Sequence, residues 1–369
     1  MILQYYGMLS SPHSWSAVSQ SLLLEFQKQG IALRCKSTNG FGSIPPSLVP
    51  TCMNLNMPIK TEVSFSYTIP PNLIKIDAKH KIQIYNSDND ILPDGWASLM
   101  NSGAHLILPS SEFAKEIFLK NKVIEEKMVV VPHGYDPNLF NPNFPKLNIP
   151  EIDNSKFKFL CVSAPHYRKG IDVLIKAYIE EFKGDEDVVL IIKSSMNSHE
   201  VNAHFHVDIA QIAANLQKTH KYKWPEIKYI NHRVESLASL YLLADAVVLS
   251  SRAECFSLTM LEASACQIPT ITTDYGGHLD FLNHDNSYLI DYVMKACPKE
   301  GQYHQVKAGS LIAEPSHDDL KRLMRHVKNN PEEAKSKAML AYSQVVDKYT
   351  WKSAADQILE LIKEREWKL

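Results

Sequence analysis

Residues Ser250 to Gly277 give the clearest indication of the fold; they read SSRAECFSLTMLEASACQIPTITTDYGG. An apolar run at 246–249 precedes them, a short polar loop follows, and Leu258, Leu261 and Ala265 then recur at helical spacing. The predicted order is therefore strand, loop and helix. Such a loop presents free backbone N–H groups at the positive end of the helix dipole, where a diphosphate can bind.

Two carboxylates flank this expected anion site. Glu254 lies just before the helix, and Glu262 lies about two turns into it. Eight helical residues rise roughly 12 Å, so the two acids could hold the ends of a ligand whose middle lies on the backbone amides. A nucleotide-sugar has that shape, with hydroxyls at both ends. The amides expected to take its diphosphate are those of Cys255, Phe256, Ser257 and Leu258.

The E-x7-E spacing becomes specific when the residues after it are included. E-C-F-S-L-T-M-L-E, then A-S-A-C-Q-I-P, then Gly276-Gly277 resembles the donor-site signature of glycosyltransferase family 4. This resemblance implies an α/β chain of the GT-B fold, in which two Rossmann-like, doubly wound domains face a cleft. An ordinary strand-loop-helix with surface glutamates is the alternative interpretation of the same residues.

Two further segments resemble that family. P-H-G-Y-D-P-N-L-F-N-P, at 132–142, resembles the segment that closes its N-terminal domain, where Gly134 would permit a positive-φ turn capped by Asp136. S-A-P-H-Y-R-K-G, at 163–170, resembles a segment whose lysine contacts the diphosphate. Lys169 matches that lysine. Arg168 is the candidate second cation, because the family's earlier arginine is absent; a solvated helix start is the alternative.

Candidates on the acceptor side come from the first half of the chain. A loop after the first strand contains Gly7 and His13, whose family counterparts face donor phosphates and acceptor, but it also fits a helix start capped by Ser14 or Ser16. Asp88 follows a buried strand and could orient an acceptor hydroxyl or take its proton. A turn with an Asx cap is the alternative for Asp88.

The resemblance also implies a base-binding loop in the second half. There the backbone around Arg233 and Val234 would contact the nucleotide base. A histidine cluster at 199, 204 and 206 is read as the solvated face of a helix, because no second cluster with ligand spacing accompanies it. No metal site is therefore expected, and no cofactor beyond the sugar nucleotide as co-substrate.

The 369 residues suit two domains. The predicted division is an acceptor-side domain at 1–145, a proline-rich linker at 146–155 and a nucleotide-sugar-binding domain at 156–348. A helix at 349–369 is expected to pack back on the first domain. Met128 to Val131 is expected to be the last strand of the first half, and the chain between 291 and 313 to be a looser segment.

Composition narrows the partners and the compartment. A net charge of −2 argues against nucleic acid. The six cysteines show no CxxC spacing, no sequon is present, and no run approaches the ~20 apolar residues of a membrane span. We therefore expect a cytoplasmic protein, with peripheral contact at the inner face of a membrane left open by a local basic patch at 75–81.

The resemblance implies a retaining, metal-independent glycosyltransferase. Family resemblance implies transfer from a UDP- or GDP-linked sugar to a hydroxyl of a glycan, a lipid-linked molecule or a small molecule, as part of glycan biosynthesis. Two alternatives stay open. One is a nucleotide-sugar epimerase on the same fold, and the other is a non-catalytic nucleotide-sugar binding module. The sequence does not indicate an oligomeric state.

Overall fold

The computed structural model describes residues 2–10, 14–40, 42–53, 61–147, 149, 152–184, 187–194, 209–219, 221–232, 234–298, 307 and 309–368. The chain divides into two compact units. One contains Met1–Gly134 and Asp347–Leu369, and the other contains Tyr135–Val346. The sequence-based boundaries at 145 and 348 lie slightly later in the chain than these divisions.

The first unit is a parallel five-stranded sheet in the order β2-β1-β3-β4-β5. Its strands are β1 Ile2–Gly7, β2 Ala32–Ser37, β3 Thr61–Tyr67, β4 Ala78–Ile84 and β5 Leu106–Leu108. Its helices are α1 Ser14–Lys28, α2 Val49–Met53, α3 Trp96–Gly103, α4 Glu112–Lys120 and α11 Trp351–Glu364. The middle strand β3 is buried at six of its seven residues, as a parallel sheet covered by helices requires.

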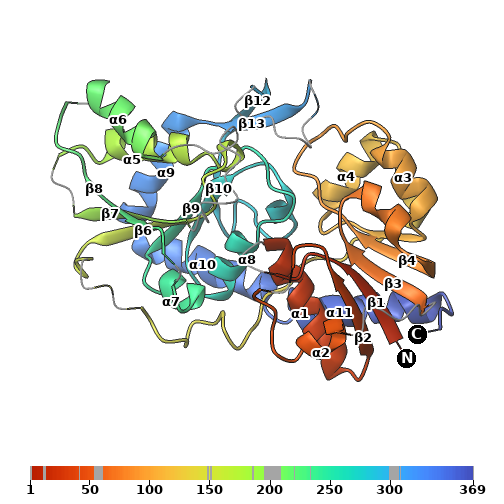
Figure 1. The fold of residues 1–369 in the computed structure, drawn as a ribbon. Helices are drawn as coiled ribbons and strands as arrows, with labels where there is room; N and C mark the ends of the chain where they lie inside the picture. The colour runs from red at the N-terminus through yellow and green to blue at the C-terminus, as the bar shows by residue number, and fades with distance from the viewer. Residues whose placement is uncertain are drawn as a thin grey trace. The chain divides into compact units, whose positions relative to one another are not determined.

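The second unit is a parallel six-stranded sheet in the order β11-β10-β9-β6-β7-β8. Its strands are β6 Phe157–Val162, β7 Val188–Lys193, β8 Glu226–Ile230, β9 Ala246–Leu249, β10 Thr270–Thr273 and β11 Tyr288–Ile290. Its helices are α5 Ile171–Glu181, α6 Ile209–Thr219, α7 Leu237–Tyr241, α8 Leu258–Ala265, α9 His317–Asn329 and α10 Pro331–Val345. Figure 1 shows α5 and α6 on one side of these strands and α7 and α8 on the other. The predicted doubly wound α/β class is confirmed in both units.

Each strand order contains a point where the winding direction reverses. In the second unit the chain runs from β6 outward to β8, then returns to place β9 on the other side of β6. In the first unit the reversal lies between β1 and β3. Loops that leave the carboxyl ends of strands at such a point diverge, and ligands of open α/β sheets bind between them. In the second unit these loops are 163–170 and 250–257.

Two local predictions are wrong. Met128–Val131 forms no strand of its own: Met128 makes one isolated parallel bridge to Ile107, and Val129 and Val131 each donate one hydrogen bond. The segment expected to be loose contains an antiparallel hairpin, β12 Tyr292–Ala296 and β13 Leu311–Pro315. The strands of this hairpin are far apart in the sequence, so no short turn signal marks them.

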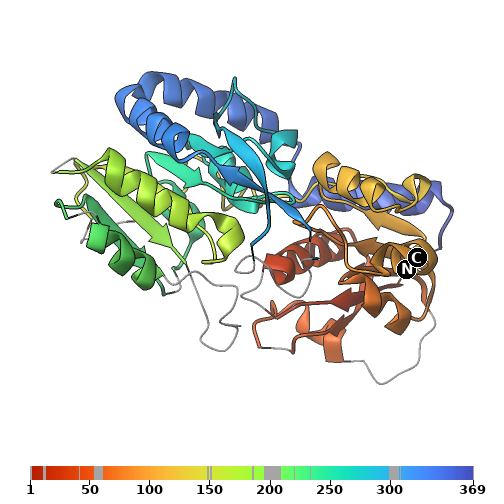
Figure 2. The same cartoon turned by 90° about the horizontal axis from the view of Figure 1, so that it is seen from above.

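The C-terminal helix completes the first unit. Helix α11 packs on α1, and Gln29 donates a hydrogen bond to Asp356 at 2.8 Å. The two termini lie side by side in both ribbon views (Figures 1 and 2). The apolar side chains Trp351, Ile358 and Ile362 of this helix are buried. The first unit therefore contains residues from both sides of the second unit in the sequence.

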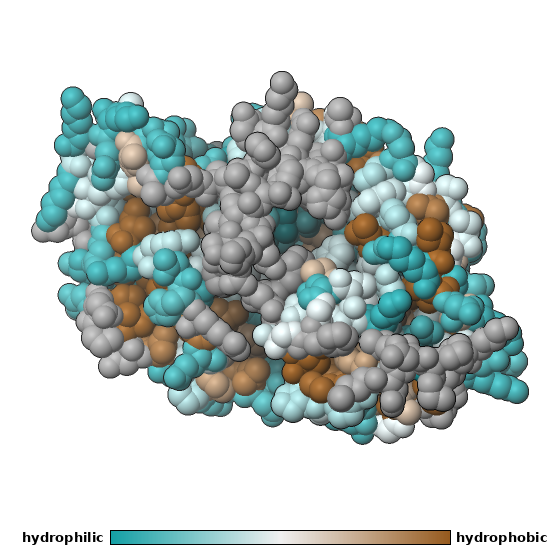
Figure 3. Space-filling model, in the orientation of Figure 1, coloured by the Kyte–Doolittle hydropathy of each residue, from teal (hydrophilic) through white to brown (hydrophobic). Residues whose placement is uncertain are grey.

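The surface is mixed in polarity. On the face shown in Figure 3, hydrophobic residues form separate patches within a mostly hydrophilic surface. None of the helices in the described part of the chain combines the length and apolar composition that crossing a bilayer requires.

The φ of Gly134 is not positive, so the predicted turn geometry is wrong. Glycine is needed at this position because a side chain would collide with neighbouring backbone. A Cβ atom at this position would lie 2.2 Å from the backbone nitrogen of Trp351 and 2.3 Å from the carbonyl carbon of Thr350. Asp136 does cap the turn that follows, since its Oδ1 accepts from the N–H of Asn138 at 2.9 Å. The glycine lets the chain pass directly against the start of α11.

We expect Gly134→Ala to lower the free energy of unfolding by about 2 kcal/mol, because backbone atoms must move to admit the methyl group. Urea denaturation measures this change. Gly42→Ala is the matched control: its Cβ would meet only the Ser10 hydroxyl, at an ordinary 3.4 Å. Equal effects of the two substitutions would contradict the proposed packing role.

Candidate functional site

Two loops at the reversal point of the second unit are tied together. Gly170 has φ +64, and a Cβ on it would lie 1.8 Å from the carbonyl oxygen of Ser250. The Ser250 hydroxyl donates to the carbonyl of Gly170 at 2.8 Å. Arg168 Nη1 donates to the carbonyl of Ala253 at 3.0 Å. The loops after β6 and β9 therefore meet where a ligand of this sheet would bind.

Glu254 joins both loops through its carboxylate. Its Oε1 pairs with Lys169 Nζ, lies 3.5 Å from Arg168 Nη1 and accepts from the Ser251 hydroxyl at 2.9 Å. Within the described residues, no hydrogen bond reaches Oε2. One carboxylate oxygen is thus saturated by the protein, and the other has no hydrogen-bond partner in the described part of the chain.

The Glu254 carboxylate is buried but charged. Burial by itself raises its pKa, but Lys169 and Arg168, with hydrogen bonds from Lys169 and Ser251, hold that pKa well below the usual range. Two cations and one carboxylate leave the cluster with a net positive charge. An anion at this point would be attracted more strongly than at the protein surface, because the low-dielectric surroundings screen little.

Helix α8 directs its N-terminus at the same place. Ser257, at the N-cap, has φ 71 and ψ 79, a left-handed conformation that costs a non-glycine residue about 1–2 kcal/mol. Among the described residues, the backbone N–H groups of Ser257, Leu258 and Thr259 have no acceptor. Ser257 keeps only 6% of its surface exposed, and its hydroxyl is buried without a hydrogen-bond partner. Unmet donors and backbone strain together are typical of functional sites.

Glu262 lies farther along α8, where it accepts a hydrogen bond from the Tyr241 hydroxyl at 2.9 Å. Its side chain is partly exposed. Burial raises the pKa of its carboxyl to about 7, although the Tyr241 hydrogen bond opposes the shift. Tyr241, from α7, therefore fixes an acid that is only partly ionised near neutral pH.

The double glycine after β10 supports the Glu254 loop. Gly277 donates its N–H to the carbonyl of Glu254 at 2.8 Å. Gly276 has φ +133, and a Cβ there would lie 2.7 Å from the same carbonyl oxygen. Only glycine fits both the conformation and the close approach. Gly276 and Gly277, at the end of the motif, thus hold the backbone of Glu254 at its start.

The other predicted residues are distributed as follows. Val234 lies in the loop after β8, whereas Gly7 and Asp88 belong to the first unit. Gly7 has a packing role, since a Cβ there would lie 2.2 Å from the Tyr5 hydroxyl. His13 and Arg233 lie outside the described residues, as do the histidines at 199, 204 and 206. Helix α1 begins at Ser14, so Ser16 is not its cap.

Sequence reasoning missed a second ionic cluster beneath the first. Arg252, only 2% exposed, pairs with Asp172 and Glu314. It lies in the quoted stretch, but nothing in the local pattern distinguishes it from a solvated arginine. Lys193, buried at the carboxyl end of β7, was also missed, and burial lowers its pKa. The charged residue in an otherwise apolar run, Val188–Lys193, could have indicated it.

Over the described residues, no group of three or more His, Cys, Asp or Glu side chains is placed to hold a metal ion. All six cysteines are free thiols.

One family matches the part of the chain that carries this site. The match to Glycosyl transferases group 1 spans residues 145–344. The chain belongs to the glycosyl transferases group 1 family. The matched range contains both loops, α8 and the double glycine.

Curated relatives of this member of the group 1 family are distant. A probable sucrose-phosphate synthase of Thermosipho melanesiensis is 24% identical over 243 residues, which cover 65% of the chain and 48% of that protein. A D-inositol 3-phosphate glycosyltransferase of Paenarthrobacter aurescens is 25% identical over 189 residues, 50% of the chain and 44% of that protein. The chain spans about half the length of these relatives.

Solved structures show the same fold for this group 1 chain. HepE of Anabaena, in complex with UDP and glucose, has a TM-score of 0.69 at 13% identity and is covered over 99% of its chain, against 98% here. Sucrose-phosphate synthase from Thermosynechococcus elongatus has a TM-score of 0.72 at 13% identity, with 99% of both chains covered. The predicted GT-B fold is confirmed.

We expect Ser257→Gly to raise the free energy of unfolding of the free protein by about 1 kcal/mol. Glycine adopts the left-handed conformation without steric conflict, and the buried unpaired hydroxyl is removed. Gln267→Gly, at φ 59 beyond the other end of α8, isolates the backbone contribution. Thermal and urea unfolding measure both. A destabilised Ser257→Gly protein would show that the serine stabilises the start of α8 and would contradict a functional reason for its strain.

Proposed function

We propose that the protein is a retaining glycosyltransferase of family 4 that transfers a sugar from a nucleoside-diphosphate sugar to an acceptor hydroxyl. The observation that carries the proposal is the position of Glu254, Lys169 and Arg168 at the reversal point of the sheet, beside the N-terminus of α8. Cations, free amides and an unpaired carboxylate oxygen then converge on one place. Those are the groups that a sugar diphosphate needs.

Each group has a separate role in this proposal. The diphosphate binds the amides of Cys255, Phe256, Ser257 and Leu258, and Lys169 and Arg168 neutralise its charge. Glu254 accepts hydrogen bonds from hydroxyls of the transferred sugar through Oε2. Glu262 binds the ribose. The loop with Arg233 and Val234 contacts the base through its backbone, and Gly7, His13 and Asp88 are the acceptor-side candidates.

The chemistry follows from where charge develops. The bond between the anomeric carbon and the β-phosphate oxygen breaks as the acceptor oxygen attacks from the same face, and the acceptor proton passes to the departing phosphate oxygen. Negative charge grows on the diphosphate, and Lys169, Arg168 and the α8 amides stabilise it in place. These positive groups supply what a divalent metal supplies elsewhere, so we propose that no metal is required.

The donor class draws support from a structural neighbour. HepE has been solved with UDP-glucose, and its fold matches this chain over almost its full length. We propose a UDP- or GDP-linked donor and a glycan, lipid-linked or small-molecule acceptor, in a cytoplasmic enzyme that can touch the inner face of a membrane.

The decisive experiment is a screen of UDP- and GDP-sugars by thermal shift and donor hydrolysis. A ligand at 100 times its Kd adds about 2.7 kcal/mol of stability. Binding with hydrolysis or transfer supports the proposal. Interconversion of free sugar nucleotides, seen by NMR, would identify an epimerase instead. Binding without either reaction would identify a non-catalytic module.

We expect activity to persist in the presence of a metal chelator, because Lys169 and Arg168 already neutralise the leaving diphosphate. Donor hydrolysis is measured with EDTA, and with EDTA followed by excess Mn²⁺. Activity that disappears with EDTA and returns with Mn²⁺ would refute metal independence. The matched variant is Lys169→Met, which should lose at least tenfold in kcat, equal to about 1.4 kcal/mol.

We expect Glu262→Gln to separate stability from binding. The pKa of Glu262 rises on folding from 4.5 to about 7, so its stabilising contribution is full below about pH 4.5 and is lost as pH rises through 7. The variant should therefore match the wild type at pH 4.5 and exceed its free energy of unfolding by about 2 kcal/mol at pH 8.

The same variant should bind nucleoside diphosphate about 1–3 kcal/mol more weakly at pH 8, because the amide cannot accept from the ribose as a carboxylate does. Calorimetry with UDP and GDP measures this loss. Unchanged affinity for every nucleoside diphosphate that the wild type binds would remove Glu262 from the ribose site.

A further inference from the structure

The loop that carries Lys169 rests on a buried arginine. Arg252 Nη1 and Nη2 donate to the two carboxylate oxygens of Asp172 at 2.8 and 2.7 Å, and Nε and Nη2 donate to those of Glu314 at 2.8 and 3.0 Å. Nη1 also donates to the carbonyl of Tyr167 at 2.6 Å. The guanidinium lies 3.9 Å above the Tyr167 ring. One planar group thus ties α5, β13 and the Tyr167–Lys169 turn.

The backbone of Arg252 extends the same connection. Its N–H donates to the carbonyl of Arg168 at 2.6 Å, and its carbonyl accepts from the N–H of Ala313 at 3.0 Å. Glu254 is two residues farther along. The guanidinium of Arg252 therefore holds the carbonyl of Tyr167, and its backbone N–H holds the carbonyl of Arg168. Both carbonyls lie in the turn that contains Lys169.

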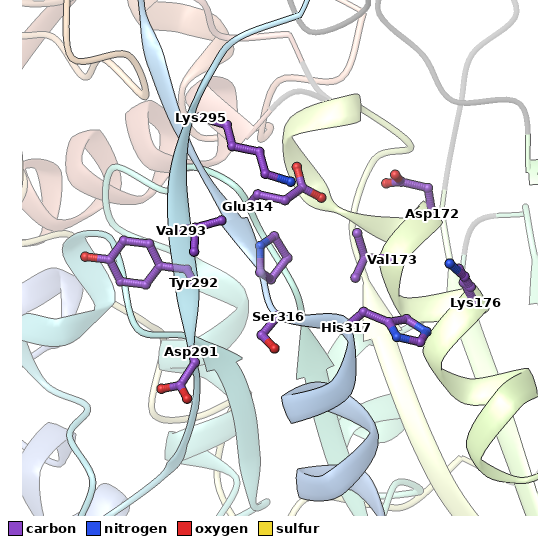
Figure 4. Close-up of a pocket in the computed structure, with 11 residues that line it drawn as sticks. Asp172, Val173, Lys176, Asp291, Tyr292, Val293, Lys295, Glu314, Ser316 and His317 are labelled. Atoms are coloured by element: carbon purple, nitrogen blue, oxygen red, sulfur yellow. The ribbon is translucent and has the colours of Figure 1, made fainter.

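The two carboxylates line a cavity whose lining does not include Arg252. The cavity has a volume of about 580 Å³, and Asp172 and Glu314 line it with residues of β12, α5 and α9. In Figure 4, Glu314 and Lys295 extend toward one another from the two strands of the hairpin. Asp172 and Glu314 keep 28% and 19% of their side-chain surface exposed, whereas Arg252 keeps 2%. Water can thus solvate the acids, but the arginine depends on its protein partners.

We infer that Arg252 is a positioning residue of the donor site: it holds the Tyr167–Lys169 turn so that Lys169 meets Glu254 and the diphosphate. The inference rests on the proposed function. A lysine at 252 would keep the charge, but its single ammonium cannot serve both carboxylates and the Tyr167 carbonyl in one plane. The turn would then be free to shift, and Lys169 with it.

A double-mutant cycle with UDP as the probe, or GDP if the wild type binds only that nucleotide, tests this role. The four proteins are the wild type, Arg252→Lys, Lys169→Met and the double variant. Arg252→Lys should weaken binding about tenfold when Lys169 is present. In the Lys169→Met background it should change binding less than about twofold, because the group it positions is gone. An equal loss in both backgrounds would show a merely structural role and overturn the inference.

Arg325→Lys is the matched control. Arg325 also pairs with a carboxylate, donates to a carbonyl and stacks on an aromatic ring, at Glu181 and Phe182. These contacts lie at the C-terminal end of α5, whereas the donor loop 163–170 precedes its N-terminal end. It should leave the UDP affinity within about twofold. A tenfold loss in this control would equally overturn the inference, because any arginine network would then produce the effect.

A second variant covers a failure of Arg252→Lys to fold. Glu314→Gln removes one charged partner and leaves the pair with Asp172, and its cycle with Lys169→Met should show the same non-additivity. Additive losses in that cycle would overturn the inference while the proposed function stands. A folded wild type that binds no nucleoside diphosphate would overturn the proposed function and this inference with it.

Discussion

The contact between Glu254 and its two cations is the interaction on which the site depends. Lys169 and Arg168 leave the sheet after β6, and Glu254 leaves it after β9, at the point where the strand order reverses. A carboxylate this deeply buried is tolerated only because both cations and the Ser251 hydroxyl face it. The contact keeps the carboxylate from being buried without a counter-charge, and it leaves one acid oxygen without a hydrogen bond from the described residues.

Around this contact, glycines hold the backbone at short range. Gly170 brings one loop against Ser250, and Gly276 brings another against Glu254. Ser257 differs from these glycines, because it is in a left-handed conformation that strains a residue with a side chain. Its hydroxyl is buried without a hydrogen-bond partner. The loops are thus held rigidly where they contact each other. Their unpaired hydrogen-bond donors lie at the carboxyl ends of the strands, which is the pattern of a preorganised site.

The sequence predicted features whose residues are neighbours in the chain, but it did not predict contacts between residues far apart in the chain. The strand-loop-helix around Glu254, and the pair Arg168 and Lys169, are local patterns, and the fold class follows from the alternation of strands and helices. Arg252 was missed because its acidic partners lie far away along the chain, on α5 and β13. The β12–β13 hairpin lacks a short turn, and the need for Gly134 comes from Thr350 and Trp351, which no local pattern contains.

The interrupted course of the first unit has a consequence for synthesis on the ribosome. Its five strands emerge first, but α11, which packs on α1 beside Gly134, emerges only after the whole second unit. Domains generally fold as units while the chain is being made. Here the second unit has all its residues available before the first does. The sheet of the first unit therefore remains without the cover of α11 until residues 351–364 have been released.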